Sequence, residues 1–538
     1  MTSNKVLAAP PGTCCIETVH HSGTAVGRWE DIGPMRTYVS PPSHKQGSDR
    51  ILLFFPDIWG PDYLNNQLMM DYFASHGYLV VAPDYFKGEP IFKVERGPAF
   101  DMLTWVKPHR DVADLLVPGW IDAVKAKYVE AFFANMDAGL IISSTGYCFG
   151  ALDVAILTST DWLAAGAFVH PSFLTEDHFK AAKQTDWVFP TASRVRAEEI
   201  LVDMKANYHI EVFAKVQHGF GTRGDPNVPE QRWAKEQSAK SVLAWFDRFC
   251  HSLLDISHHM MLADSRSHIH SHRGGETLKL YLPSTTAMAS NQVLASSPGE
   301  CCLKTVQHTG TPVGSWEHVG PMNTYKSLPP HKTTYDRILL FFCDIFGPEY
   351  INNQLLMDYA SNGYLVVGPD CFEGKAIFKV DRGPDFDLTK WVPPYRERAD
   401  GFIPSWIGAI KSKYGNEKTK YVTVGYCFGG PDVVNLAATD WLAAGAFVHP
   451  AFLTEDRFRN VKQPLFLSCA EIDQTFPPAS RHRAEEILVE IKANYHVQVF
   501  ARVEHGFGVR GDPNIPEQRW AKEESARSIL GWFDRFCN

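Results

Sequence analysis

The sequence is written twice along the chain. NKVLAAPPGTCCIETVHHSG, which begins at Asn4, returns as NQVLASSPGECCLKTVQHTG at Asn291, an offset of 287 positions. Both copies end in WFDRFC, at Trp245 and Trp532. Solenoid repeats have periods of about 20–50 residues, so a period this long indicates a duplicated domain. The chain is therefore predicted to form two similar domains, residues 1–250 and residues 288–538.

The segment between the copies, residues 251–287, has no counterpart in either of them. It begins HSLLDISHHMML and shows no sustained hydrophobic period, which favours a linker. Its histidines leave metal binding open as an alternative. Met288 opens MASNQVLASSPG, which mirrors the start of the chain, MTSNKVLAAPPG. This likeness suggests that two tandem genes were joined.

Composition narrows the class of protein. Hydrophobic residues make up 45% and charged residues 21% of the chain, the balance of a soluble globular protein. A formal net charge of −9 argues against nucleic acid or an acidic membrane surface as the main partner. No run of about 18 apolar residues is present to span a bilayer, and the first residues lack a secretory signal. The 11 cysteines include no C-x-x-C pair, so reduced thiols in a cytoplasmic protein are expected.

Within each copy, buried strands alternate with amphipathic helices. The predicted strands of the second copy are RILLFF at Arg337–Phe342, GYLVVGPD, KYVTVG, AGAFVHP, PLFLSCAEID and HVQVFARVEHGF. Helices are predicted at Tyr350–Ser361, Ala399–Tyr414 and Pro478–Tyr495, with a last one ending in WFDRF. This alternation predicts an α/β fold, a doubly wound and mostly parallel sheet, with ligands at the carboxyl ends of the strands.

GYCFG occurs in both copies and has the outline of a nucleophile elbow, G-x-S-x-G, with cysteine in place of serine. In the second copy it follows the apolar strand KYVTVG directly. Its glycines permit a tight strand-to-helix turn that would present Cys427 above the sheet. A helix N-terminus at this point would favour the thiolate of Cys427. An inert buried thiol is the alternative.

A cysteine nucleophile needs a base, and the base needs an orienting acid. Asp473 follows the strand in LFLSCAEID, and His505 follows the next strand, so the order is nucleophile, acid, histidine. An oxyanion hole is expected from the amides of Phe428 and Ile345, the latter in the loop FFCDIFGPE.

These motifs resemble the dienelactone hydrolase family, carboxymethylenebutenolidase-like α/β-hydrolases with a Cys–Asp–His triad. The resemblance rests on DIFG, GYCFGG, the EIDQTFP loop and HGFGVRGD, and it covers nearly all of both copies. It implies that Cys427 is the nucleophile, His505 the base and Asp473 its orienting acid. It also implies hydrolysis of a lactone or activated ester through an acyl-cysteine, without a cofactor or a metal ion.

The resemblance extends to three further residues. Arg510, shortly after the histidine, would bind a substrate carboxylate, with a structural pair to Asp512 as the alternative. Family members hold the resting cysteine with a glutamate, but this chain has Asp344 at that position. His449 ends the strand AGAFVHP and either lines the pocket or is a structural histidine.

The first copy aligns at Cys148 and His218 but not at the acid. RNVKQPLFLSCAEIDQTFPPAS in the second copy becomes KAAKQTDWVFPTAS in the first, so eight residues of the strand before the acid are missing. Asp186 then has no strand to hold it. The segment before Cys148 is also seven residues longer than its partner. We therefore expect the first copy to lack one strand and to be degenerate, with erroneous splicing of the transcript as the alternative source of the same pattern.

The sequence thus predicts a hydrolase of a lactone or small carboxylic ester, active mainly in the second copy. Its partner would be a small molecule, with no role for nucleic acid or membrane. Two alternatives stay open, since fold alone does not decide function. One is a thioesterase or other acyl-transfer enzyme, and the other is a duplicated binding protein without turnover.

Overall fold

A computed structural model of the chain describes residues 6–12, 15–43, 50–130, 141–181, 184–187, 191–259, 291–329 and 335–537. Helix α8 (Pro229–His259) runs on past position 250. The rest of the predicted linker, residues 260–287, lies outside the described residues, as does Met288.

The second copy holds the longer set of strands. Its strands are β9 (Val293–Ala295), β10 (Ser315–Val319), β11 (Met322–Ser327), β12 (Arg337–Phe342), β13 (Leu365–Pro369), β14 (Lys420–Tyr426), β15 (Ala444–Val448), β16 (Leu453–Thr454), β17 (Leu465–Ile472) and β18 (Tyr495–Glu504). Its helices are η5 (Glu300–Leu303), α9 (Ile351–Ala360), η6 (Ile377–Lys379), α10 (Leu388–Tyr414), η7 (Cys427–Gly429), α11 (Gly430–Ala437), α12 (Glu455–Arg459), α13 (Pro478–Glu490), α14 (Phe507–Arg510) and α15 (Pro516–Cys537).

The first copy follows the same order. Its strands are β1 (Arg28–Ile32), β2 (Met35–Ser40), β3 (Arg50–Phe55), β4 (Leu79–Pro83), β5 (Ile141–Tyr147), β6 (Ala165–Val169), β7 (Gln184–Trp187) and β8 (Asn207–Phe213). Besides α8, its helices are α1 (Leu64–Ser75), η2 (Ile91–Lys93), α2 (Met102–Lys125), the π-helical turn η3 (Ala126–Glu130), η4 (Cys148–Gly150), α4 (Ala151–Leu157), α5 (Glu176–Ala181), α6 (Thr191–Asp203) and α7 (Phe220–Arg223).

The predicted α/β class is confirmed. A ten-stranded sheet has the order β10-β11-β13-β12-β14-β15-β17-β18-β8-β7, and the pairs from β13 through β12 to β18 are parallel. These strands are buried on both faces, which is why they read as apolar runs rather than as alternating patterns. Their carboxyl ends lie at one edge, where GYCFG, EID and VEH lead out of β14, β17 and β18.

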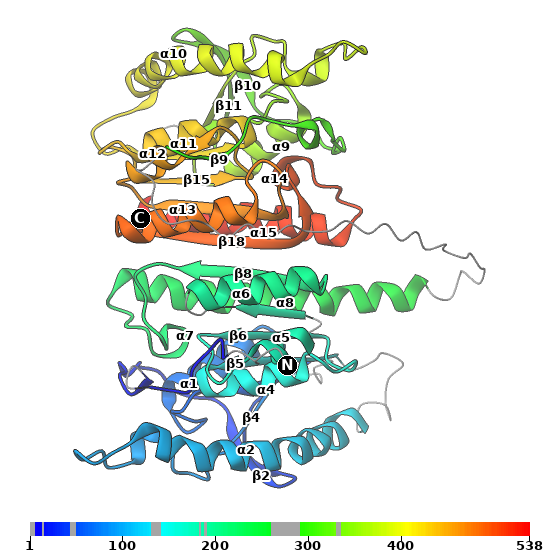
Figure 1. The fold of residues 1–538 in the computed structure, drawn as a ribbon, viewed down its shortest axis with the longest axis vertical. Coiled ribbons are helices and arrows are strands. Elements are labelled where there is room, and N and C mark those ends of the chain that lie inside the picture. Colours follow the sequence, from blue (N-terminus) through cyan, green and yellow to red (C-terminus); the bar gives the residue numbers. More distant parts are fainter. Residues whose placement is uncertain are drawn as a thin grey trace.

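The two copies share this sheet. β18 of the second copy pairs antiparallel with β8 of the first, with Gln498 opposite Glu211 at the middle of the register. These two residues occupy equivalent positions in their copies, so the pairing has a pseudo-twofold axis between them. Figure 1 shows the copies stacked along the long axis, with β8 and β18 adjacent at the centre and α2 and α10 at opposite ends.

Ion pairs between the copies obey the same pseudo-symmetry. Arg194 pairs with Glu485 and Arg481 with Glu198, and all four side chains are almost fully buried. Arg248–Glu517 and Arg535–Glu230, both at 3.3 Å, form a second reciprocal set. The repeat offset of 287 maps one ion pair of each set onto the other. The copies therefore meet as two subunits of a symmetric dimer would.

The strand before the acid differs between the copies. β17 has eight residues and joins β15 to β18. Its counterpart β7 has four, and it pairs with β8 while β6 ends a separate six-stranded sheet. The predicted loss of a strand in the first copy is thus partial, because the shortened segment still reaches far enough to pair along β8.

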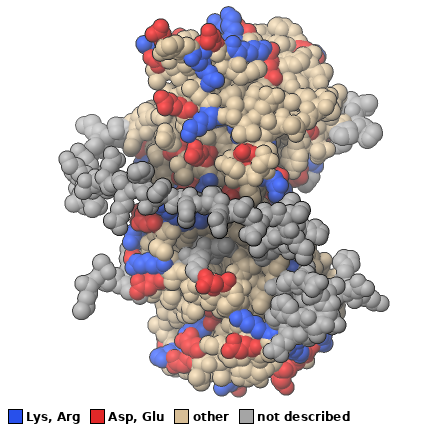
Figure 2. All heavy atoms as spheres, turned by 90° about the vertical axis from the view of Figure 1, so that its right-hand side faces the viewer, with Lys and Arg blue, Asp and Glu red and all other residues tan. Residues whose placement is uncertain are grey.

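The surface carries charges of both signs. Figure 2 shows acidic and basic side chains intermingled on one face of the molecule. Within the described ranges, no helix is long and apolar enough to cross a membrane.

Candidate active site

The GYCFG elbow of the second copy is a tight turn from β14 through η7 into α11. Cys427 has a φ of 48°, in the left-handed region, and its side chain is 0% exposed. The glycines are required by close approach. A Cβ on Gly425 would lie 2.2 Å from the Gly429 carbonyl oxygen, and a Cβ on Gly429 would lie 2.4 Å from the Phe342 carbonyl oxygen. The sharp turn that the pentapeptide predicts is therefore built from contacts that no larger residue permits.

Arg396 on α10 supports this turn from below. Its guanidinium donates to both carboxylate oxygens of Asp432, at 2.9 and 2.7 Å, and to the Phe428 carbonyl at 3.0 Å. It also lies 4.7 Å from the centre of the Phe428 ring. Sequence reasoning missed Arg396. The signal was an arginine on the apolar stripe of a helix, between Val392 and Ala399, where only a paired charge can be buried.

Asp473 and His505 meet at the carboxyl ends of β17 and β18. His505 Nδ1 lies 2.9 and 3.0 Å from the two carboxylate oxygens of Asp473, and both side chains are buried. Asp473 also accepts the amides of Thr475 and Phe476, at 2.8 and 2.9 Å. Burial opposes charge on the imidazole, but the Asp473 carboxylate and the Cys302 sulfur outweigh it and raise the pKa of His505 well above its usual range. The carboxylate thus orients the ring and favours its protonation.

A second cysteine lies beside the first. Cys302 Sγ is 3.7 Å from Cys427 Sγ, and both sulfurs lie within 4.8 Å of a ring nitrogen of His505. Because Nδ1 is bonded to Asp473, we assign this nitrogen as Nε2. Cys302 belongs to the CC dipeptide that recurs in both copies, but nothing in the local sequence indicates that it returns to the elbow. Its side chain is fully buried.

Arg510 and Asp344 bind each other. Arg510 Nε lies 2.9 Å from Asp344 Oδ2, and both side chains are buried. Asp344 Oδ1 accepts from the Phe346 amide and the Asn353 side chain. The predicted alternative partner, Asp512, is therefore replaced by Asp344. Binding of a substrate carboxylate by Arg510, and a contact of Asp344 with the resting cysteine, stay predictions.

The other half of the Arg510 guanidinium anchors the segment that carries Cys302. Nη1 donates to the carbonyls of Cys302 and Lys304, at 2.7 and 2.6 Å. The arginine that resembles a substrate-binding residue in the sequence thus fixes the second cysteine near the first.

His449 follows β15 and is completely buried. Its ring centroid lies 4.8 Å from that of His505, edge to face, and neither ring nitrogen has a hydrogen-bond partner among the described residues. Burial, together with His505 and Arg510, lowers the pKa of His449 well below its usual range. A neutral ring packed against His505 agrees with the structural alternative.

The two expected oxyanion donors lie on neighbouring segments. β12 and β14 are parallel, with Phe342 opposite Gly425. Ile345 therefore leaves β12 at the level at which Cys427 and Phe428 leave β14. Because these two strands are neighbours, the Ile345 and Phe428 amides lie at the same edge of the sheet.

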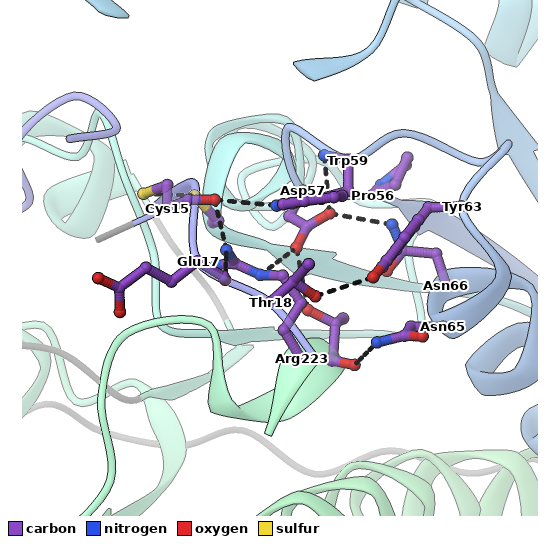
Figure 3. Close-up of polar contacts among 12 residues, drawn as sticks. Cys15, Glu17, Thr18, Pro56, Asp57, Trp59, Tyr63, Asn65, Asn66 and Arg223 are labelled. Carbon is purple, nitrogen blue, oxygen red and sulfur yellow. Dashed lines mark hydrogen bonds and ion pairs between the residues drawn. The ribbon is translucent and has the colours of Figure 1, made fainter. Parts of the chain in front are cut away.

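The first copy repeats most of this arrangement. Cys148 has a φ of 49°, and its Sγ lies 3.7 Å from Cys15 Sγ; both sulfurs lie within 4.8 Å of a ring nitrogen of His218. Figure 3 shows Arg223 between Asp57 and the backbone of the segment that carries Cys15, the counterpart of the Arg510 arrangement. His218 lines a cavity of about 270 Å³.

The acid is the point of difference. Asp473 follows the last residue of β17, whereas Asp186 lies inside the four-residue β7. No hydrogen bond from His218 to a carboxylate occurs among the side chains that the structure describes. The first copy thus has both cysteines and the histidine, Cys148, Cys15 and His218, but its strand before the acid is shorter.

Comparison with known proteins places the chain in a family. The model of the dienelactone hydrolase family matches residues 35–250 and 322–537. Hydrolase pyvD of Aspergillus violaceofuscus is 36% identical over 44% of this chain and 97% of its own length. Dienlactone hydrolase 1 of Gibberella moniliformis is 34% identical over 46% of this chain and 96% of its own.

A solved structure of a putative dienelactone hydrolase from Klebsiella pneumoniae is 16% identical, with a TM-score of 0.36. It covers 41% of this chain and 98% of its own. The Aspergillus and Gibberella hydrolases each correspond to about one copy of the repeat. The chain belongs to the dienelactone hydrolase family, as a tandem duplication of its domain.

Proposed function

We propose that the second copy hydrolyses a lactone or small carboxylic ester through an acyl-cysteine on Cys427. The observation that carries the proposal is the buried Asp473–His505 pair beside the Cys427 elbow. Family membership supports a hydrolase, and two relatives named dienlactone hydrolase support lactones as the substrate class.

The steps follow from these groups. His505 takes the proton of Cys427, and the thiolate attacks the ester carbonyl. The amides of Ile345 and Phe428 would stabilise the oxyanion of the tetrahedral intermediate. The C–O bond then breaks, the alkoxide takes the proton from His505, and the acyl-thioester remains. His505 next removes a proton from water, which attacks the thioester and releases the carboxylic acid and the Cys427 thiol.

Asp473 has a defined part in both half-reactions. Its carboxylate accepts from Nδ1, so the other nitrogen, Nε2, is the one available to exchange protons with Cys427 and water. It also compensates the charge of the imidazolium that forms. Because Cys427 is 0% exposed, a substrate reaches it only after covering side chains move.

Hydrolysis of p-nitrophenyl acetate and of dienelactone by the full chain tests the proposal. Cys427→Ala is expected to reduce kcat by at least about 10³-fold, since it removes the nucleophile. Cys148→Ala is the matched control and should retain most of the activity. Intact hydrolysis in Cys427→Ala would refute the mechanism, and loss in Cys148→Ala would assign activity to the first copy.

Mass spectrometry of the protein during turnover separates hydrolysis from binding. An acyl adduct on the peptide that contains Cys427 is expected with a slowly hydrolysed ester. A ligand that stays bound without an adduct or product would favour the duplicated binding protein.

A further inference from the structure

Two thiols and an imidazole converge on one buried point in the second copy. Cys302 Sγ and Cys427 Sγ are 3.7 Å apart, and with the His505 ring nitrogen they lie within 4.8 Å of one another. All three residues are buried. The proposed hydrolysis uses Cys427 and His505 but gives Cys302 no part. A buried thiol so close to the nucleophile needs a separate explanation.

The sulfur separation matches that of a zinc thiolate site. Zinc binds cysteine sulfur at about 2.3 Å and histidine nitrogen at about 2.0–2.1 Å in a tetrahedral arrangement. Two thiolates on one zinc ion are therefore about 3.8 Å apart, from these bond lengths and the tetrahedral angle. The observed 3.7 Å is close to this distance. A disulfide, by contrast, requires the sulfurs to approach to about 2.05 Å.

The surroundings of the three ligand atoms also suit a metal ion. Histidines that bind zinc usually donate their other ring N–H to a carboxylate, which fixes the ring and increases its basicity. His505 has this bond, to Asp473 at 2.9 Å. Arg510 holds the backbone of Cys302 in place through the Cys302 carbonyl at 2.7 Å. The ligand set is thus pre-oriented.

We propose that Cys302, Cys427 and His505 bind zinc or another thiophilic divalent cation. The two thiols and the protonated Nε2 of His505 lose their protons to water as two Zn–S bonds and one Zn–N bond form, and a water molecule completes the tetrahedron. The bound ion is coordinated by the Cys427 sulfur, which is then not available as a nucleophile. Metal binding stands independently of the proposed function, whereas inhibition of hydrolysis by the metal rests on it.

The first copy supports the same interpretation. Cys15 Sγ and Cys148 Sγ are also 3.7 Å apart, and they also lie within 4.8 Å of a histidine nitrogen, on His218. The arrangement thus occurs in both copies, although the acid strand has changed in one. The full chain is expected to bind two ions, and Cys15→Ser leaves the second-copy site to be measured alone.

Cobalt(II) is the probe, because thiolate-to-cobalt charge transfer gives a near-ultraviolet absorption band that reports the ligands directly. The full-length Cys15→Ser chain, reduced with a phosphine, is titrated with cobalt(II) and then with zinc as competitor. One equivalent with a thiolate band is expected. Cys302→Ser should weaken binding at least about 100-fold, and Asp473→Asn about 10–100-fold, the usual effect of losing such a partner.

Cys301→Ser is the matched control. Cys301 is the neighbouring cysteine and is only partly buried, and its sulfur lies outside the three-residue cluster, 4.0 Å from that of Cys302. This variant should bind cobalt as the Cys15→Ser parent does. Cys302→Ala serves as the second variant if serine at the buried position prevents folding, which circular dichroism checks.

Absence of a thiolate band in the Cys15→Ser chain overturns the proposal, and so does a band that survives both Cys302 variants. The activity arm measures p-nitrophenyl acetate hydrolysis with and without zinc, each variant against its own zinc-free rate. Cobalt binding without any esterase activity supports the metal site and contradicts the proposed function. Esterase activity that depends on Cys427, without cobalt binding, supports the proposed function and contradicts the metal site.

Discussion

The carboxylate of Asp473 holds both its own loop and the ring of His505. Its carboxylate accepts two backbone amides, which fix the loop after β17, and it accepts His505 Nδ1, which fixes the ring. An amide side chain would keep the shape but could present N–H to a ring nitrogen that must itself carry a proton. The tautomer of His505 therefore depends on the charge of this one side chain.

Replacing the acid tests that dependence. Asp473→Asn is expected to lower kcat for p-nitrophenyl acetate by about 10²–10⁴-fold, since the ring loses both orientation and charge compensation. Asp186→Asn, at the aligned position of the first copy, should change kcat by less than twofold. Steady-state kinetics on both variants measure the difference. Equal losses would show that the first copy uses its acid as well.

The residues that sequence found and those it missed differ in kind. Cys427, Asp473 and His505 each follow a strand in a recognisable local pattern, so their order alone predicted that they lie together. Cys302 approaches Cys427 across 125 positions, and no local pattern encodes such a contact. The Arg510–Asp344 pair is likewise tertiary: either residue, read alone, is a charged side chain near a strand end.

The elbow is an element whose tightness comes from its glycines. Gly425→Ala would put a methyl group 2.2 Å from the Gly429 carbonyl oxygen, and backbone there cannot move without displacing Cys427. We expect a loss of about 3 kcal/mol in the free energy of unfolding and a large loss of activity. Urea denaturation and p-nitrophenyl acetate hydrolysis measure the two effects.

Gly401→Ala is the control for that substitution. Gly401 is exposed within α10, and an added Cβ there meets nothing within 4 Å. Alanine should raise the free energy of unfolding by about 0.5–1 kcal/mol and leave activity unchanged. If Gly425→Ala behaved in the same way, the close packing described for the elbow would be wrong.

Strands and helices were predicted well where the segment is buried on both faces and therefore reads as one apolar run. The strand Arg337–Phe342 was located to the residue, because β12 is buried on both faces. α10 begins at Leu388, eleven residues before the predicted start, because Asp387 caps it and its prolines did not end it. The β10–β11 hairpin was not predicted, since β10 is mostly exposed and carries only a weak apolar signal. Short, half-solvated elements depend on their neighbours more than on their own residues.

At the scale of the whole molecule, buried charge joins the two copies. Arg481 and Glu198 are nearly inaccessible to water, and His482 adds a contact of 3.1 Å to the same carboxylate. Burial raises the pKa of Glu198, but Arg481 and His482 outweigh it, so the net effect is to lower that pKa. The folded chain therefore binds fewer protons at this group than the unfolded chain does in acid.

This shift predicts an acid dependence of stability. The contribution of Glu198 is present above its unfolded pKa near 4.5 and is lost as pH falls below it. The free energy of unfolding should fall by up to about 1.4 kcal/mol per pH unit more in the wild type than in Glu198→Gln. Urea denaturation between pH 3 and 6 measures the slope. Glu199→Gln, an exposed neighbour on α6, should keep the wild-type slope.

The shared sheet predicts how a separated copy behaves. The second copy alone, residues 288–538, would expose β18, whose unpaired edge invites another strand. We expect it to form a homodimer through β18, with Gln498 opposite Gln498. Sedimentation measures the mass. Gln498→Glu would place two buried carboxylates opposite each other and should shift the species to monomer, whereas a monomeric parent would contradict the prediction.

The pairing of β8 with β18 also bears on what natural selection can remove. A mutation that silences chemistry in the first copy leaves β8 in place, and β8 still covers the edge of the second copy. A mutation that unfolds the first copy uncovers that edge. Under the proposed function, selection should therefore tolerate changes at Cys148 and around Asp186 while preserving Glu211 and the buried arginines, so that the first copy persists as a structural partner of the second.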